Sequence, residues 1–186
     1  MDLNQFRILN KLKSVYRVSK VGDRNESTAE HTWACLMLAD YFLEKYDYNL
    51  DKKRVIDLLM YHDVMEIEAG DVSVYDNEPA EQKKAREEKA LQKLISSLTR
   101  EHAARLKSLF HEYEESKTRE AQFALAIDKF EPVIHNLDYP KIWNEFNITE
   151  RMIREKKEKY LKPFPEILAL FNEIMRYARE KKIVVY

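Results

Sequence analysis

The scarcity of glycine constrains the fold of this chain more than any other feature. Only two glycines, Gly22 and Gly70, occur in 186 residues. Sheet-rich architectures use glycine at many of their turns, and glycine-rich phosphate-binding loops need several glycines close together. No stretch shows a convincing alternation of apolar and polar residues, which is the pattern of a half-buried strand. We therefore expect an all-α protein in which any phosphate is held by side chains, helix ends or a metal.

Apolar residues recur at helical spacing along most of the chain, as they do on one buried face of a helix. The sequence predicts helices over the ranges 3–15, 28–42, 51–67, 81–98, 99–113, 118–137, 150–161 and 163–182. Polar or aromatic connections are expected at 16–26, 71–79 and 139–146. There is no internal repeat, and a chain of this length fits one domain, so we expect residues 1–186 to form a single domain.

A capping motif marks the start of the second predicted helix. Ser27 and Glu30 have the S-x-x-E spacing of a capping box, in which each side chain binds a backbone N–H of the other residue. His31 then falls in the first turn. The residues that follow, at 33–42, are apolar almost all round, which is typical of a helix in the centre of a protein.

Three further polar groups lie on or beside apolar helices. His62 and Asp63 end the apolar run 55–60, and Asp128 lies in the middle of another apolar helix. Taken singly, His31 would more often be an ordinary helix-start histidine, and Asp128 a buried aspartate satisfied by a cap or an arginine. On its own, the His62-Asp63 pair is as often found where a helix simply ends and polar residues begin to meet water as at a functional site. Their joint occurrence needs a reason, because burying such groups without partners is costly.

A divalent cation would supply that reason. Without one, Asp63 and Asp128 would lie near each other in a low dielectric, where like charges are strongly unfavourable. These two carboxylates and the imidazoles of His31 and His62 suit an octahedral ion such as Mn, Co, Fe, Ni or Mg, with two positions left for water and substrate. A closed zinc site more often uses thiolates, and the single cysteine, Cys35, fits the apolar core.

The ordered set of His31, His62-Asp63 and Asp128 resembles the HD-domain metal-dependent phosphohydrolases. Over most of its length the chain is similar, more narrowly, to the small 5'-deoxynucleotidase branch of that family. The further residues that carry this likeness are Glu30, Tyr61, Glu66, Gly70, Asp71 and the stretch 76–79. An HD dipeptide alone is a weak signal, whereas the full ordered set on apolar helices is a strong one.

The resemblance implies a compact helical bundle, often a homodimer, with these two histidines and two aspartates as metal ligands. It implies roles beside the metal for Glu66 and Asp71, in water activation and in contact with substrate or a second metal. Arg17 matches a phosphate-binding arginine of the family. Members selective for deoxynucleotides can carry a tryptophan directly after that arginine, but this chain has Val18, which leaves its preference for deoxyribose open.

We therefore expect a metal-dependent phosphomonoesterase acting on (deoxy)nucleoside 5'-monophosphates. Asp63, Glu66 and Asp71 form the expected catalytic set. Glu66 would take a proton from water or give one to the leaving 5'-oxygen, and Asp71 could accept a hydrogen bond from a sugar hydroxyl. Arg17, with Arg24 as a further candidate, would neutralise phosphate charge through the guanidinium fork.

Two rival interpretations use the same residues. An HD-type site could hydrolyse another phosphate ester or a nucleoside triphosphate, because a fold does not by itself select the substrate. Alternatively, a non-catalytic helical binding module could retain a remnant of the site. The joint presence of Glu66, Asp71 and Arg17 speaks against the second of these.

Charge and hydropathy bear on partners and location. The formal net charge is -1, so no bulk basic field attracts a nucleic-acid polymer. The first ten residues lack the apolar core of a signal peptide, and the longest apolar run, 33–39, is too short to cross a membrane. We expect a cytoplasmic protein whose partners are a small phosphate ester and a second copy of itself.

Overall fold

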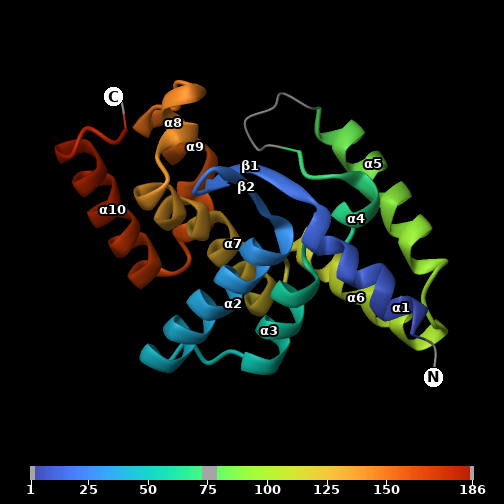
Figure 1. Cartoon of the computed structure of the whole chain (residues 1–186). Helices are drawn as coiled ribbons and strands as arrows, with labels where there is room; N and C mark the ends of the chain where they lie inside the picture. Colours follow the sequence, from blue (N-terminus) through green and yellow to red (C-terminus); the bar gives the residue numbers. More distant parts are fainter. Residues whose placement is uncertain (1–2, 73–78, 185–186) are drawn as a thin grey trace.

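The computed structural model of the chain describes residues 3–72 and 79–184 (Figure 1). Apart from one hairpin, the elements in these ranges are helical, as the sequence predicts. In chain order they are α1 (Asn4–Leu9), the 3-10 helix η1 (Asn10–Ser14), β1 (Tyr16–Val21), β2 (Arg24–Ser27), α2 (Thr28–Lys45), α3 (Lys52–Tyr61), α4 (Glu66–Ala69), α5 (Ala80–Ile95), α6 (Arg100–Glu115), α7 (Arg119–Asp138), α8 (Lys141–Glu145), α9 (Glu150–Leu161) and α10 (Pro165–Glu180).

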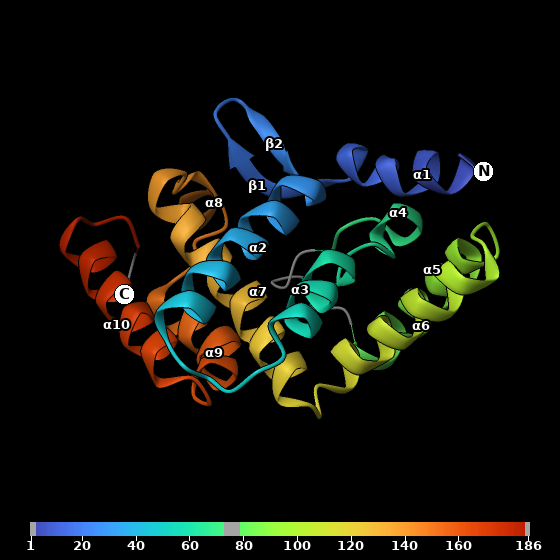
Figure 2. The same ribbon diagram turned by 90° about the horizontal axis from the view of Figure 1, so that it is seen from below.

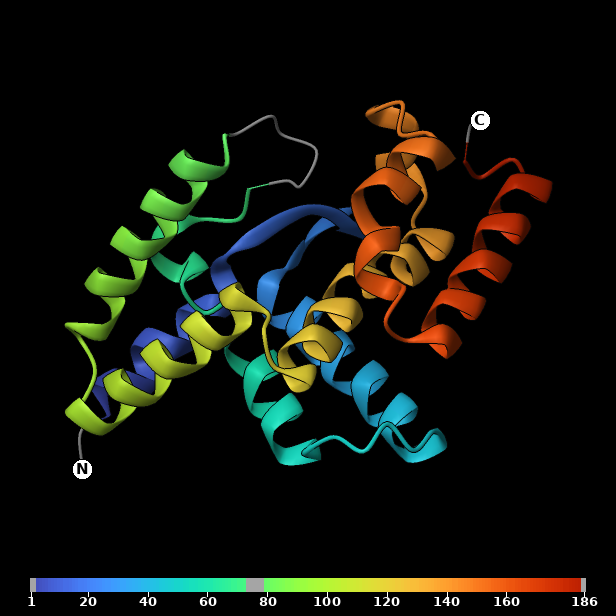
Figure 3. The same ribbon diagram turned by 180° about the vertical axis from the view of Figure 1, so that it is seen from behind.

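Helix α7 is the central element of the molecule. It contacts α2 and α3 on one side, α9 and α10 on another, and also α6 and α8. Its apolar residues Phe123, Ile127 and Phe130 are fully buried. The antiparallel α5–α6 pair lies at one end of the molecule and the α9–α10 pair at the other, with α7 between them (Figures 2 and 3). A polar side chain on α7 is therefore held by the most tightly packed helix of the fold.

The segment 16–27, predicted as a polar loop, instead forms a two-stranded antiparallel hairpin. Lys20 pairs with Asn25 and Val21 with Arg24, and Gly22 supplies the left-handed residue of the turn with φ 59°. The expectation was wrong because burial in β1 does not follow hydropathy: Ser19 is buried, whereas Tyr16 and Val18 are exposed. The period-two signal is therefore missing from the sequence although the strand is present.

Three other expectations need correction. The predicted helix 3–15 is divided into α1 and η1, and of its apolar stripe only Leu12 is buried. The predicted helix 51–67 ends at Tyr61, and the chain re-enters a helix only at α4. The connection 139–146 contains the short helix α8.

Helix α2 begins as predicted, but it is not buried all round. Ser27 accepts a hydrogen bond from the backbone N–H of Glu30, whose side chain binds back to the N–H of Ser27, so the capping box is confirmed. On the outer face, Trp33, Met37 and Tyr41 are each more than half exposed, at 65, 53 and 51 %. Cys35, in contrast, is fully buried as expected. In the part of the chain that the structure describes, no helix has the length and apolar content needed to cross a bilayer.

Candidate metal centre

His31 is the most deeply buried member of the predicted site. The capping box starts α2 at Thr28, which places His31 in the first turn with its side chain inaccessible to solvent. Its Nδ1 donates to Oε2 of Glu131 at 2.7 Å, and its Nε2 lies 3.2 Å from Oδ1 of Asp128. The carboxylate of Glu131 thus fixes the orientation of the ring, and Nε2 faces the candidate site.

A tight turn between α3 and α4 positions His62 and Asp63. The backbone N–H of Val64 bonds to the carbonyl of Tyr61, and that of Glu66 to the carbonyl of Asp63, both in the shorter i to i+3 pattern. These bonds interrupt the helix that the sequence predicted through this region. Glu66 therefore begins α4 and does not share a face of one continuous helix with His62.

The four predicted ligands converge on one point. Oδ2 of Asp63 lies 3.1 Å from Nε2 of His62 and 3.9 Å from Nε2 of His31. Oδ1 of Asp128 lies 3.2 Å from Nε2 of His31 and 3.9 Å from Nε2 of His62. Two imidazole nitrogens and two carboxylate oxygens, carried by α2, the α3–α4 turn and α7, thus face one another.

The free nitrogen of His62 supports a cation at this point. Nδ1 of His62 donates to the backbone carbonyl of Leu59 at 2.7 Å, so Nε2 carries the lone pair. This buried Nε2 has no hydrogen-bond partner among residues 3–72 and 79–184. A buried polar atom without a partner is costly, and a neutral imidazole nitrogen is a good ligand for a divalent metal. The donor set therefore fits a cation.

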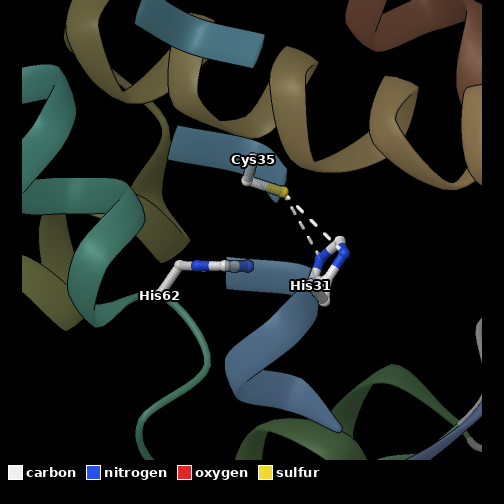
Figure 4. A group of neighbouring side chains, drawn as sticks. All are labelled: His31, Cys35 and His62. Carbon is white, nitrogen blue, oxygen red and sulfur yellow. Dashed lines mark hydrogen bonds between the residues drawn. The ribbon is translucent and has the colours of Figure 1, made fainter. Parts of the chain in front are cut away.

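Cys35 lies against the same imidazoles but is not aligned as a ligand. Figure 4 shows its sulfur beside the ring of His31, with His62 across from it. The sulfur is 3.8 Å from Nδ1 and 3.6 Å from Nε2 of His31, so it lies at nearly equal distances from both nitrogens and not in line with the lone pair of Nε2. Burial raises the pKa of the Cys35 thiol to about 12, which keeps it protonated.

The surrounding groups hold the carboxylates of both predicted ligands, Asp63 and Asp128, in the ionised form. Burial alone would raise the pKa of Asp63, but its electrostatic interactions with the neighbouring imidazoles of His62 and His31 lower it to about 2. Burial would likewise raise the pKa of Asp128, yet Lys129 and His31 hold it well below its usual range. Nζ of Lys129 and the hydroxyl of Tyr113 each donate to Oδ2 of Asp128 at 2.7 Å. The other oxygen of Asp128 is thereby left for the site.

Arg17 of β1, predicted to bind phosphate, lies beside the predicted ligands. Its guanidinium is 3.5 Å from Oδ2 of Asp63 and 3.8 Å from Oδ1 of Asp71, and its Nε is 3.4 Å from Glu26. Burial alone would lower the pKa of Arg17, but the charges of Asp63 and Asp71 raise it above its ordinary value. The guanidinium therefore stays charged at the edge of the site.

Among the acidic groups that the structure describes at the site, Glu66 is the one whose environment strongly favours the protonated form. Burial, followed by the charges of Asp63 and Asp71, raises the pKa of Glu66 to about 9. The hydroxyl of Thr28 donates to its Oε2 at 2.9 Å. Burial raises the pKa of Asp71 as well.

These groups open into one cavity of about 540 Å³. Its wall includes Arg17, Val18, Glu66 and Asp71 together with all the predicted ligands except His31, which lies deeper. A small phosphate ester fits a cavity of this size.

Arg24, predicted to bind substrate, is not brought to this cavity. It lies on the exposed side of the hairpin, where its guanidinium donates to Glu30 at 2.8 Å, and it borders a separate shallow depression beside Trp33. The stretch 76–78 that contributed to the family likeness lies outside the described residues.

Sequence reasoning missed several groups of the site: Thr28, Tyr113, Lys129, Glu131 and Lys157. The sequence does contain a signal for Glu131, which lies three residues after Asp128 on the same apolar helix. Burying this second carboxylate without a partner would be as costly as burying Asp128. Tyr113 and Lys157 come from α6 and α9, and only the tertiary packing brings them here.

The chain resembles proteins of known family over nearly all its length. The family model of the HD domain matches residues 9–168. Proteins from Bos taurus and Mus musculus named 5'-deoxynucleotidase HDDC2 are 30 % and 29 % identical to it, covering 93 % and 92 % of this chain and 84 % and 85 % of theirs. A crystal structure from Magnetospirillum magnetotacticum MS-1, described as a predicted metal-dependent phosphohydrolase, has a TM-score of 0.89 at 27 % identity. The match covers 99 % of this chain and 94 % of that one.

Proposed function

The chain belongs to the HD-domain family, and from that premise we propose that it is a metal-dependent phosphohydrolase that removes phosphate from (deoxy)nucleoside 5'-monophosphates. The relatives named 5'-deoxynucleotidase support this substrate class. The single observation that carries the proposal is the convergence of two imidazole nitrogens and two carboxylate oxygens, with Nε2 of His62 left without a partner.

In this proposal His31, His62, Asp63 and Asp128 hold one divalent cation, with Mn, Co, Fe, Ni and Mg as candidates. Oxygen and imidazole ligands suit these ions. When bound, the cation supplies Lewis-acid stabilisation of phosphate charge and makes water more acidic. Glu131 and the carbonyl of Leu59 keep the two imidazoles in the orientation that ligation needs, because each accepts a hydrogen bond from Nδ1.

The remaining groups act on substrate. Arg17 binds phosphate oxygens through its guanidinium, which already lies 3.5 Å from Asp63. Glu66, which lines the same cavity, gives a proton to the leaving 5'-oxygen. Asp71 accepts a hydrogen bond from a sugar hydroxyl. Val18, at the cavity wall beside Arg17, offers less surface to a sugar than an aromatic ring, so both ribose and deoxyribose are accepted.

We also propose that the chain forms a homodimer in the cytoplasm. The exposed row of Trp33, Met37 and Tyr41 recurs every four residues on α2, so it forms one apolar strip on the helix surface. A second copy of the chain is the partner that would bury this strip from both sides.

Phosphate release from a nucleotide panel tests the proposed function. The purified chain is assayed with ribo- and deoxyribonucleoside mono-, di- and triphosphates, in the presence of each of the five candidate metals. We expect metal-dependent release from monophosphates, with little difference between the two sugars. Phosphate release from triphosphates alone would show that the chain is instead an HD-type triphosphate hydrolase. If no phosphate were released with any metal, the result would support a non-catalytic binding module.

A further inference from the structure

Among residues 3–72 and 79–184, one buried cation of the cavity has no negative partner. Lys157 of α9 is only 5 % exposed, yet it lines the cavity. In the described ranges its Nζ forms no ion pair, and its single hydrogen bond is donated to the backbone carbonyl of Lys129 at 3.0 Å. An ammonium has three N–H donors, so Lys157 retains donors for another acceptor.

Other cations of the same cavity are paired with carboxylates. Arg17 faces Asp63 at 3.5 Å, and Lys129 binds Asp128 at 2.7 Å. At the outer wall Lys83 lies 3.6 Å from Glu87. Lys157 differs because it is both buried and unpaired, and burying an isolated ammonium is among the most costly arrangements in a protein. Such a cost is understandable where an anionic ligand provides the missing charge.

We propose that Lys157 is a substrate-binding residue whose Nζ donates to a non-bridging oxygen of the phosphate group. This inference rests on the proposed function, since the phosphate is that of the nucleotide. It adds a phosphate contact from α9 to the one that Arg17 provides from β1.

The backbone of α7 holds Lys157 in place for this contact. Pro132 also lies within α7 and lines the same cavity. The carbonyl of Lys129, in the turn before it, accepts the hydrogen bond from Lys157. The ammonium is therefore anchored one residue away from the candidate ligand Asp128.

The electrostatics of the pocket favour the binding of an anion. Burial, followed by the positive charge of Lys129, lowers the pKa of Lys157 to about 8, and the charge of Arg17 acts in the same direction. Asp128 and Glu131 oppose this effect without cancelling it. A phosphate placed among these three cations would be stabilised by all of them.

Replacement of Lys157 by methionine tests the inference, because methionine keeps much of the volume and removes the charge. The matched control is Lys162→Met at the end of the same helix, where the side chain is 65 % exposed. The wild type and both variants are loaded with Mn²⁺. Three quantities are then measured: the Kd for inorganic phosphate by calorimetry, the KM for the best monophosphate, and the melting temperature.

We expect Lys157→Met to raise the Kd for phosphate and the KM by about tenfold or more, which is the usual effect of losing one hydrogen bond to a charged group. Its melting temperature should equal or exceed that of the wild type, because an unpaired buried charge is removed. Lys162→Met should match the wild type in all three quantities.

Unchanged phosphate affinity in Lys157→Met would overturn the inference. If Lys157→Met combined a lower melting temperature with unchanged phosphate affinity, the inference would also fail, because Lys157 would then have a purely structural role. Phosphate affinity decides this question even if the wild type hydrolyses no nucleotide, so failure of the proposed function and failure of the lysine contact are separate results.

Discussion

At the scale of single residues, the orientation of the two imidazoles is the feature on which the site depends. Each ring donates through Nδ1, from His31 to Glu131 and from His62 to the carbonyl of Leu59. Each therefore presents Nε2 to the two aspartates. A histidine bound in this way loses little freedom when a metal arrives, since its ring is already fixed.

Glu131→Gln tests this orienting role. An amide oxygen can still accept from His31 but carries no charge, so the imidazole becomes a weaker ligand. We expect the affinity for Mn²⁺ to fall by about 10–100-fold, as measured by calorimetry. The exposed Glu115→Gln serves as the control and should bind Mn²⁺ like the wild type. Equal affinities in the two variants would mean that Glu131 does not act through His31.

Glu66→Gln separates proton transfer from metal binding. We expect kcat for monophosphate hydrolysis to fall by about 10²–10⁴-fold while the metal content stays the same, because glutamine cannot donate an acidic proton. The control is Glu68→Gln, two residues along α4, whose half-buried carboxylate pairs with the exposed Lys93. Loss of metal from Glu66→Gln would instead make Glu66 part of the metal site.

The same variant has a signature in the pH dependence of stability. The raised pKa of Glu66 means that the folded metal-free protein retains a proton that the unfolded chain releases between the ordinary value of 4.5 and about 9. Wild-type stability therefore declines over that window as pH rises, and glutamine removes this contribution. Denaturation in EDTA should show the advantage of Glu66→Gln growing with pH. Parallel curves for the two proteins would contradict the raised pKa.

Site residues could be predicted from the sequence where a single polar residue interrupts an otherwise apolar helix. His31, His62, Asp63 and Asp128 were found in this way, and the structure brings them together. Arg24 was chosen for its charge and its place in the loop alone, and its side chain faces solvent beside Glu30.

At the scale of elements, the break between α3 and α4 shapes the site more than either helix does. The turn at 62–65 lets His62 and Asp63 point at one centre, and Gly70 then ends α4 and leads to Asp71. The sequence marked the stop at Gly70 but not the break at Tyr61, because apolar residues continue through Val64 and Met65. Their burial, at 6 and 4 % exposed, is compatible with a turn as well as with a helix.

Gly70→Ala tests the contribution of this segment. Gly70 has φ 74° and ψ 157°, a region that is almost restricted to glycine, although no atom lies within 4 Å of an added Cβ. We expect a loss of about 1–3 kcal/mol in the free energy of unfolding and a higher KM, because the strain displaces Asp71. Gly22→Ala in the hairpin turn, also at positive φ, should lower stability without changing KM. An unchanged KM in both variants would show that the position of Asp71 does not depend on this backbone.

At the scale of the whole molecule, α7 joins the core to the site. Its apolar residues pack against helices at both ends of the molecule, and the same helix carries Asp128, Lys129 and Glu131. The all-α class and most helix ranges followed from the sequence because amphipathic spacing is a local property. The hairpin did not, because the burial of its residues does not follow their hydropathy. The cavity wall formed by α9 did not, because it depends on contacts between residues far apart in the chain.

Met37→Glu tests the proposed homodimer. A charge in the centre of the apolar strip of Trp33, Met37 and Tyr41 would oppose its burial against a second copy. We expect the wild type to have the mass of a dimer by light scattering and Met37→Glu that of a monomer. Tyr177→Glu, at an exposed site on α10, should remain dimeric. A monomeric wild type at high concentration would refute the proposal.

The central claim is that two histidines and two aspartates hold one divalent cation. Titration of the metal-free chain with Mn²⁺, followed by calorimetry, tests it most directly when Asp63→Ala is compared with the wild type and with Asp40→Ala on the exposed face of α2. We predict one tight site in the wild type and in Asp40→Ala, and loss of that site in an Asp63→Ala protein that remains folded by circular dichroism. Tight binding of Mn²⁺ by Asp63→Ala with wild-type stoichiometry would contradict the claim.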